Sequence, residues 1–203
     1  MTRPMPSIPR ATGRSTAGFT LVELLVSLTI FAVVAGVLTT VLVSANRTHR
    51  QTTHRAEIQA ASRQALSLMT AELIQAGADP SIPPAGIAGI VAADSASVRV
   101  RGDFNANGTI QTAEPSEDVT YTYNAGAGTL SRNPGSGAAV VLRNVTAMRF
   151  TYFDAANQPL SALPLSATDR ALVRSIGVTL TSADRDSHPF THTTRISLRN
   201  LAG

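Results

Sequence analysis

One continuous apolar segment dominates the hydropathy pattern of this chain. From Leu24 to Ala45 there are 22 residues without a charge, and the stretch before them holds a single acid, Glu23. At a rise of about 1.5 Å per residue, such a helix is roughly 33 Å long and crosses a bilayer core of about 30 Å. The pattern predicts a transmembrane helix over 19–45, and a carboxylate near its start marks a candidate functional site.

The helix is predicted to continue as an amphipathic helix over 46–77. No Pro or Gly occurs from Asn46 to Ala76, and apolar residues recur at spacings near three, four and seven, with polar residues such as Glu72 on the other faces. These apolar positions are Ile58, Ala61, Ala65, Leu66, Met69 and Leu73. Gly77 ends the helix, and the Pro-rich residues 78–89 predict an extended linker.

The pattern changes to a period of two in residues 90–203, which predicts a β-rich globular head. Alternation is clearest at 119–123, 148–152 and 176–180, and Asn, Gly and Pro clusters separate these segments. Alternating strands have one buried face, and the amphipathic helix is the available cover. The predicted fold class is therefore α+β, with a long N-terminal helix packed on an antiparallel β-sheet.

Composition narrows the chemistry. The chain has no Cys, which excludes disulfides and Cys-based metal sites. All 17 basic residues are Arg, and removal of residues 1–18 would leave 14 Arg against 13 Asp and Glu, so no nucleic-acid surface is predicted. The sequence contains no phosphate-binding glycine loop, nucleophile elbow or paired zinc-ligand histidines, and we predict no catalytic activity.

A candidate calcium loop occupies residues 103–114. Its sequence matches D-x-[DN]-x-[DN]-G-x5-E, in which alternating oxygen ligands converge on one ion. The predicted ligands are Asp103, Asn105, Asn107, the carbonyl of Thr109, Gln111 through water, and Glu114. With only two charged ligands, the expected dissociation constant is about 10⁻⁴ to 10⁻³ M. The alternative is a solvated turn rich in Asn and Gly.

The residues Gly-Phe-Thr-Leu-Val-Glu, followed directly by an apolar helix, resemble the class III signal of type IV prepilins and type II secretion pseudopilins. The resemblance implies cleavage between Gly18 and Phe19 by a membrane-embedded prepilin peptidase, with 1–18 as leader and N-methylation of Phe19. It makes Glu23 the assembly residue, whose carboxylate pairs with the free amine of a neighbouring subunit and offsets the cost of burying both charges. An ordinary membrane anchor, the main competing interpretation, gives no reason for this pattern.

The resemblance extends more weakly to the soluble part. The phrase ELIQAG at 72–77 is similar to W-type minor pilins (PilW), which favours a minor pilin that primes or caps a type IV pilus. The alternatives are a minor pseudopilin of a type II secretion system and a membrane-anchored calcium-binding domain that never polymerises. The implied partners are other pilins or pseudopilins and an inner-membrane assembly platform. The expected location is the inner membrane with a periplasmic head, then a surface pilus or periplasmic pseudopilus.

Overall fold

The computed structural model describes residues 18–112, 116–183 and 189–201. The chain divides into two compact units, Met1–Arg50 and Gln51–Gly203. The second unit contains every strand, so we refer to it as the head. Each unit is described by itself below.

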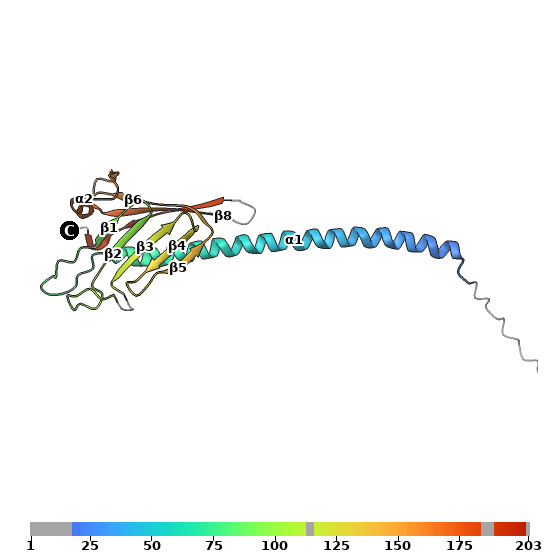
Figure 1. The fold of residues 1–203 in the computed structure, drawn as a ribbon, viewed down its shortest axis with the longest axis horizontal. Helices are drawn as coiled ribbons and strands as arrows, with labels where there is room; N and C mark the ends of the chain where they lie inside the picture. The colour runs from blue at the N-terminus through green and yellow to red at the C-terminus, as the bar shows by residue number, and fades with distance from the viewer. Residues whose placement is uncertain (1–17, 113–115, 184–188, 202–203) are drawn as a thin grey trace, which may run out of the picture. The chain divides into compact units, whose positions relative to one another are not determined.

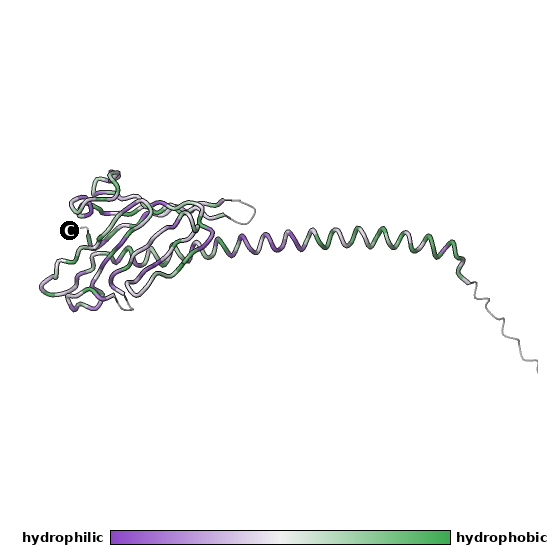
Figure 2. The backbone as a smooth tube through the Cα atoms, viewed as in Figure 1, coloured by the Kyte–Doolittle hydropathy of each residue, from purple (hydrophilic) through white to green (hydrophobic). Residues whose placement is uncertain are grey.

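The predicted long helix is confirmed as α1, Leu21–Ile74, which has 54 residues (Figure 1). Figure 2 shows its hydropathy changing from mainly apolar in its first part to mixed in its second. Only the second part has buried side chains, and these are Ile58, Ser62, Ala65, Leu66, Met69 and Leu73. The spacing of three and four between them places them on one face, as amphipathic periodicity requires.

Glycine closes α1 where the sequence predicted its end. Gly77 has φ of 78°, and its N–H donates to the carbonyl of Arg101 at 2.7 Å. A side chain at this position would also meet Leu201, because a Cβ built there lies 2.6 Å from the Leu201 Cδ2 atom. Glycine is therefore required both by the backbone conformation and by close packing of the chain's last residues.

The first sheet is an antiparallel meander with the strand order β1-β2-β3-β4-β5. Its strands are β1 (Ile90–Ala93), β2 (Ser97–Arg101), β3 (Asp118–Asn124), β4 (Thr129–Asn133) and β5 (Ala139–Arg143). Each strand pairs with the one before it in the chain, as in the Val98–Tyr121 pair of β2 and β3. The buried face alternates along the strands, as the period of two predicts.

The second sheet has the order β7-β6-β8-β9. Its strands are β6 (Val145–Phe153), β7 (Pro159–Leu160), β8 (Ser175–Ala183) and β9 (Pro189–Ser197), and a short helix α2 (Ala167–Leu172) lies between β7 and β8. A 3₁₀ turn, η1 (Arg199–Leu201), follows β9. The sequence predicted antiparallel strands but did not divide them between two sheets. The division occurs at Asn144, the single residue between β5 and β6, which has φ of 60°.

One hydrophobic core joins α1 to both sheets. Its fully buried side chains include Met69 and Leu73 of α1, Tyr121 of the first sheet, and Phe150 and Tyr152 of the second. Polar contacts reinforce the junction between the sheets. The turn between β1 and β2 lies against β6, where the Phe150 N–H donates to the Ser95 carbonyl at 2.8 Å and the Tyr152 hydroxyl donates to the Asp94 carbonyl at 2.9 Å. The α+β, pilin-like architecture is thus confirmed.

Candidate functional sites

The first candidate site lies at the start of α1. Gly18, Phe19 and Thr20 precede the helix, and Phe19 is 80% exposed. The Glu23 N–H donates to the Thr20 Oγ1 atom at 3.2 Å, while the Thr20 N–H donates to the Glu23 Oε2 atom at 3.1 Å. This reciprocal pair is a capping box, which explains locally why the helix begins at Leu21.

The capping box leaves part of the Glu23 carboxylate available. The Thr20 hydroxyl also donates to Oε2, at 3.0 Å, so Oε2 carries both bonds. Within the described residues, Oε1 of Glu23 accepts no hydrogen bond. The helix start carries a partial positive charge, which favours a negative group at this position. A carboxylate fixed in direction, with one oxygen open, is suited to pairing with a cation from another molecule.

The side chains that follow Glu23 form a continuous exposed apolar surface. The large apolar residues of this surface are Leu24, Leu25, Val26, Leu28, Ile30, Phe31, Val33, Val34, Val37, Leu38, Val41, Leu42 and Val43. Among the described residues, α1 is the one helix that is long and apolar enough to cross a membrane, judged by length and composition. Such a surface is stable only in lipid or against other apolar helices.

The second candidate site is the predicted calcium loop after β2. Asp103 is fully buried, and its carboxylate accepts hydrogen bonds from the N–H groups of Asn107 at 3.3 Å and Gly108 at 2.8 Å. The Asn105 Oδ1 atom accepts from Asn107 N–H, and the Asn107 Oδ1 atom accepts from Thr109 N–H at 2.8 Å. Three predicted ligands thus hold successive turns of the loop, and Gly108 supplies the turn with φ of 74°.

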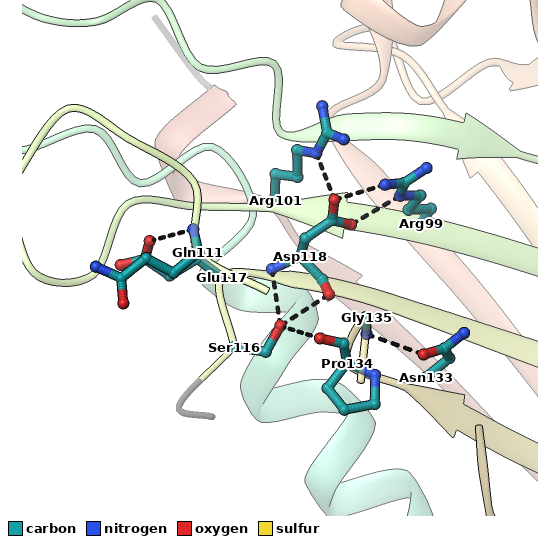
Figure 3. A network of polar contacts seen from close by, with 9 residues as sticks. All are labelled: Arg99, Arg101, Gln111, Ser116, Glu117, Asp118, Asn133, Pro134 and Gly135. Carbon is teal, nitrogen blue, oxygen red and sulfur yellow. Dashed lines mark hydrogen bonds and ion pairs between the residues drawn. The ribbon is translucent and has the colours of Figure 1, made fainter. Parts of the chain in front are cut away.

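Glu117 is a loop residue that the sequence reasoning missed. It is buried, and its Oε1 atom accepts from the N–H groups of Phe104 at 2.8 Å and Asn105 at 3.2 Å. Its Oε2 atom accepts from Gln111 N–H at 3.0 Å (Figure 3). Asp103 and Glu117 therefore both hold the loop's backbone, because their carboxylates accept hydrogen bonds from its N–H groups. The predicted ligand Glu114 lies outside the described residues. The sequence feature that could have identified Glu117 is an acidic residue directly before β3, the strand that closes the loop.

The base of this loop is anchored on the sheet (Figure 3). Asp118 forms ion pairs with Arg99 at 2.6 Å and Arg101 at 2.8 Å. Burial opposes ionisation of Asp118, but hydrogen bonds and charge attraction from both guanidiniums outweigh it and hold its pKa below the usual value. The Ser116 hydroxyl donates to the Pro134 carbonyl at 2.7 Å, which ties the loop's end to the turn after β4.

The donor chemistry of the loop is compatible with calcium, whose preferred ligands are oxygens. Asp103, Asn105 and Asn107 offer side-chain oxygens at alternate positions. Among the described residues, however, no group of three or more His, Cys, Asp and Glu side chains is arranged to hold a metal ion. The calcium site and its ligand set stay predictions.

A second carboxylate of α1 joins the helix to the first sheet. Glu72 forms an ion pair with Arg132 of β4 at 2.7 Å and accepts a short hydrogen bond from the Tyr121 hydroxyl of β3. Burial, together with the Glu72 charge, raises the pKa of Tyr121 far above its usual value, so Tyr121 donates its proton throughout the physiological range. The helical pattern placed Glu72 on a polar face, whereas the sheet half-buries it.

Comparison with known families identifies the first site. Residues 13–39 match the prokaryotic N-terminal methylation motif and carry a class III prepilin-type signal. No curated protein matches the chain. The motif supports a type IV pilin-like or pseudopilin-like protein, implies processing by a prepilin peptidase and assembly with other pilins, and suggests a structural, non-catalytic subunit. The apolar helix and the motif together fit membrane anchoring.

Proposed function

We propose that this protein is a minor type IV pilin, a non-catalytic subunit that takes part in priming or capping a pilus. The observation that carries the proposal is the arrangement at the start of α1. A prepilin-type signal leads into a capped helix, Glu23 lies in its first turn, and a long apolar surface follows. Each of these features serves the insertion of a helix among other apolar helices.

In this proposal, maturation creates the cation that Glu23 needs. Hydrolysis of the amide bond between Gly18 and Phe19 frees the Phe19 amine, which the peptidase then methylates. Both Gly18 and Phe19 precede the helix, in backbone that a peptidase can bind in extended form. The open Oε1 atom of Glu23 then pairs with the amine of a neighbouring subunit in the filament core. Pairing offsets most of the cost of placing each charge in an apolar environment.

The test is the amount of sheared surface filament from a strain lacking this protein, compared with its parent. We expect sharply reduced filament, restored by the normal gene. Glu23→Ala should be cleaved normally yet fail to restore filament or to appear in it. Glu57→Ala is the matched control, because Glu57 lies on the same helix with a side chain 69% exposed, and it should restore filament fully.

Two other results would change the assignment. Unchanged filament together with loss of exported enzymes from the culture medium would identify a minor pseudopilin of a type II secretion system. A chain that keeps residues 1–18 in the membrane would point to an anchored head that never polymerises. Normal incorporation of Glu23→Ala would refute the assembly role of that carboxylate.

We further propose that the loop at 103–114 binds calcium and that the ion stabilises the head. Support comes from the oxygen-rich donor set and from Asx turns that already order Asp103, Asn105 and Asn107. The calcium proposal fits a head that lies in the periplasm or outside the cell, because a dissociation constant of about 10⁻⁴ to 10⁻³ M suits a calcium-rich exterior.

Calorimetry and thermal unfolding of the full chain in detergent test the calcium proposal. We expect heat of binding and a rise in melting temperature at several millimolar calcium, and neither with magnesium at the same concentration. Asn105→Ala should weaken both effects, while Asn124→Ala, at the last residue of β3, should not. No heat and no melting shift with calcium would refute this proposal and leave the pilin proposal untouched.

A further inference from the structure

A cavity of about 460 Å³ lies on the head, apart from both sites described above. It is lined by the linker before β1 with the first residue of that strand, by the helix α2, by Arg174 two residues beyond α2, and by the 3₁₀ turn η1. Its wall is partly apolar, with Ile87, Ile90 and Leu201 among its residues, and Arg170 and Arg174 also line it. Two cations in one small cavity require an explanation.

Each of these guanidiniums is oriented by main-chain carbonyls. The Arg170 Nη1 atom donates to the Leu165 carbonyl at 2.8 Å. The Arg174 Nη1 atom donates to the Ala171 carbonyl at 2.8 Å and to the Val173 carbonyl at 3.1 Å. Within the described residues, the Nε and Nη2 atoms of both side chains donate to no acceptor. Each arginine therefore keeps donors for a ligand, in the planar fork that matches an oxyanion.

No acidic side chain among the described residues balances this charge. The cavity is lined by no Asp or Glu of the described part of the chain. The acid of α2, Asp169, accepts instead from the Ser166 hydroxyl at 2.7 Å, where Ser166 caps the helix. Within the described residues, Arg170 and Arg174 therefore have no acidic partner at this cavity, and a bound anion supplies the missing counter-charge.

The backbone positions both arginines firmly. The Arg174 N–H donates to the Phe153 carbonyl at 2.8 Å, and its own carbonyl accepts from Leu198 N–H at 2.9 Å, so this residue is held between the end of β6 and the residue that follows β9. The loop leading to α2 is held by the Leu165 N–H, which donates to the Ala93 carbonyl of β1 at 2.9 Å. A site whose charged groups are held in place before binding loses less entropy when the ligand arrives.

We propose that this cavity is an oxyanion-binding site, with Arg170 and Arg174 as its ligands. The group bound is a carboxylate or a phosphate, because both present paired oxygens to a guanidinium fork. Asn200 also lines the cavity, and its Nδ2 atom already donates to the Gln75 carbonyl at 3.3 Å, so it shapes the wall. The apolar wall beside the arginines accommodates the carbon skeleton of a small organic acid.

Arginine modification by phenylglyoxal tests this site in the full chain, purified in detergent. The chain has no Lys, so the reagent's main targets are its Arg side chains, and mass spectrometry reads each one separately. The probes are sodium acetate and sodium phosphate, with sodium chloride at matched ionic strength as the reference. We expect both Arg170 and Arg174 to be protected by one of the probes, and Arg149, an exposed arginine of β6, to remain reactive.

Variants separate a shared site from two independent arginines. Arg170→Gln should raise the probe concentration that half-protects Arg174 by at least about tenfold, as expected for loss of a charged hydrogen-bond partner. Arg149→Gln should leave it unchanged, and near-UV circular dichroism should confirm an intact head in both. Stronger protection by acetate assigns the site to carboxylates, and stronger protection by phosphate assigns it to phosphates. Equal protection of all arginines, or none at Arg170 and Arg174, would overturn the proposal.

Discussion

The two halves of α1 belong to one helix, but their side chains have different surroundings. The large apolar side chains from Leu21 to Val43 are exposed along their whole length, whereas from Ile58 to Leu73 one face is buried against the sheets. Among the described residues, no side chain of the first half is buried, whereas the second half is part of the head's core. An unbroken apolar pattern therefore indicates a helix covered by lipid or by other apolar helices. An amphipathic pattern indicates a helix with one face packed on its own domain.

The two glutamates at the ends of α1 repeat this contrast. Glu23 is exposed, and among the described residues its carboxylate accepts hydrogen bonds from Thr20 alone, within the same turn. Glu72 is half-buried and bonds to Arg132 and Tyr121, which belong to the sheet. One carboxylate is left open to other molecules, and the other is used to hold the helix on the head. Matched substitutions in the two halves of α1 test whether the two carboxylates have these different roles.

Leucine truncation should give the largest difference. Leu73→Ala removes a fully buried side chain and should lower the free energy of unfolding of the head by about 3 kcal/mol. Leu38→Ala, at a side chain 57% exposed, should change it by less than about 0.5 kcal/mol. Denaturation of the full chain in detergent, followed by tyrosine fluorescence, measures both, because the chain has no Trp and its Tyr residues lie in the head. Equal effects would refute the division of α1.

Removing the carboxylates of Glu72 and Glu23 one at a time should give a smaller difference in head stability between the two halves of α1. Glu72→Ala removes the carboxylate that accepts from both the half-buried guanidinium of Arg132 and the Tyr121 hydroxyl, and should cost about 2 kcal/mol of head stability. Glu23→Ala should leave head unfolding unchanged while abolishing filament incorporation. The same denaturation experiment measures the free energy of unfolding of the head in both variants. A large decrease in Glu23→Ala would contradict this separation of roles.

A change at the helix start should act only locally. Thr20→Ala removes the hydroxyl that caps α1 and should destabilise its first turn by about 1 kcal/mol. Hydrogen exchange of the full chain in detergent should show faster exchange at the Glu23 amide, with the head's melting temperature unchanged. Unaltered exchange at Glu23 would mean that the capping box does not stabilise the helix start.

Acid should produce the smallest effect, confined to the head. The two neighbouring guanidiniums hold the pKa of Asp118 below its usual value near 3.8. Because the folded-state pKa is the lower one, the stabilisation is present above about pH 4 and is lost as the pH falls through the folded-state pKa. The denaturation midpoint should fall between pH 6 and pH 3, by less in Asp118→Asn. An equal fall in both proteins would assign the acid sensitivity to other groups.

Local patterns were enough to predict some parts of the molecule and not others. The long helix, the signal at its start and the alternating strands follow from periodicity and from short motifs, because their causes lie within a few residues. The division into two sheets depends on the backbone of Asn144, and the anchoring of Glu72 depends on Arg132, which is 60 residues away in sequence. The loop motif located Asp103 but missed Glu117, whose partners appear only when the loop closes.

The strand order of the first sheet has a consequence for how the head folds. Each of β2 to β5 pairs with its predecessor in the chain, so this sheet grows hairpin by hairpin and needs no residue beyond Arg143. Contacts of short sequence separation form fastest, since little loop entropy is lost before they are made. A chain delivered from its N-terminus can therefore complete its first sheet on the emerging end of α1, and β6 to β9 then add to a surface that already exists.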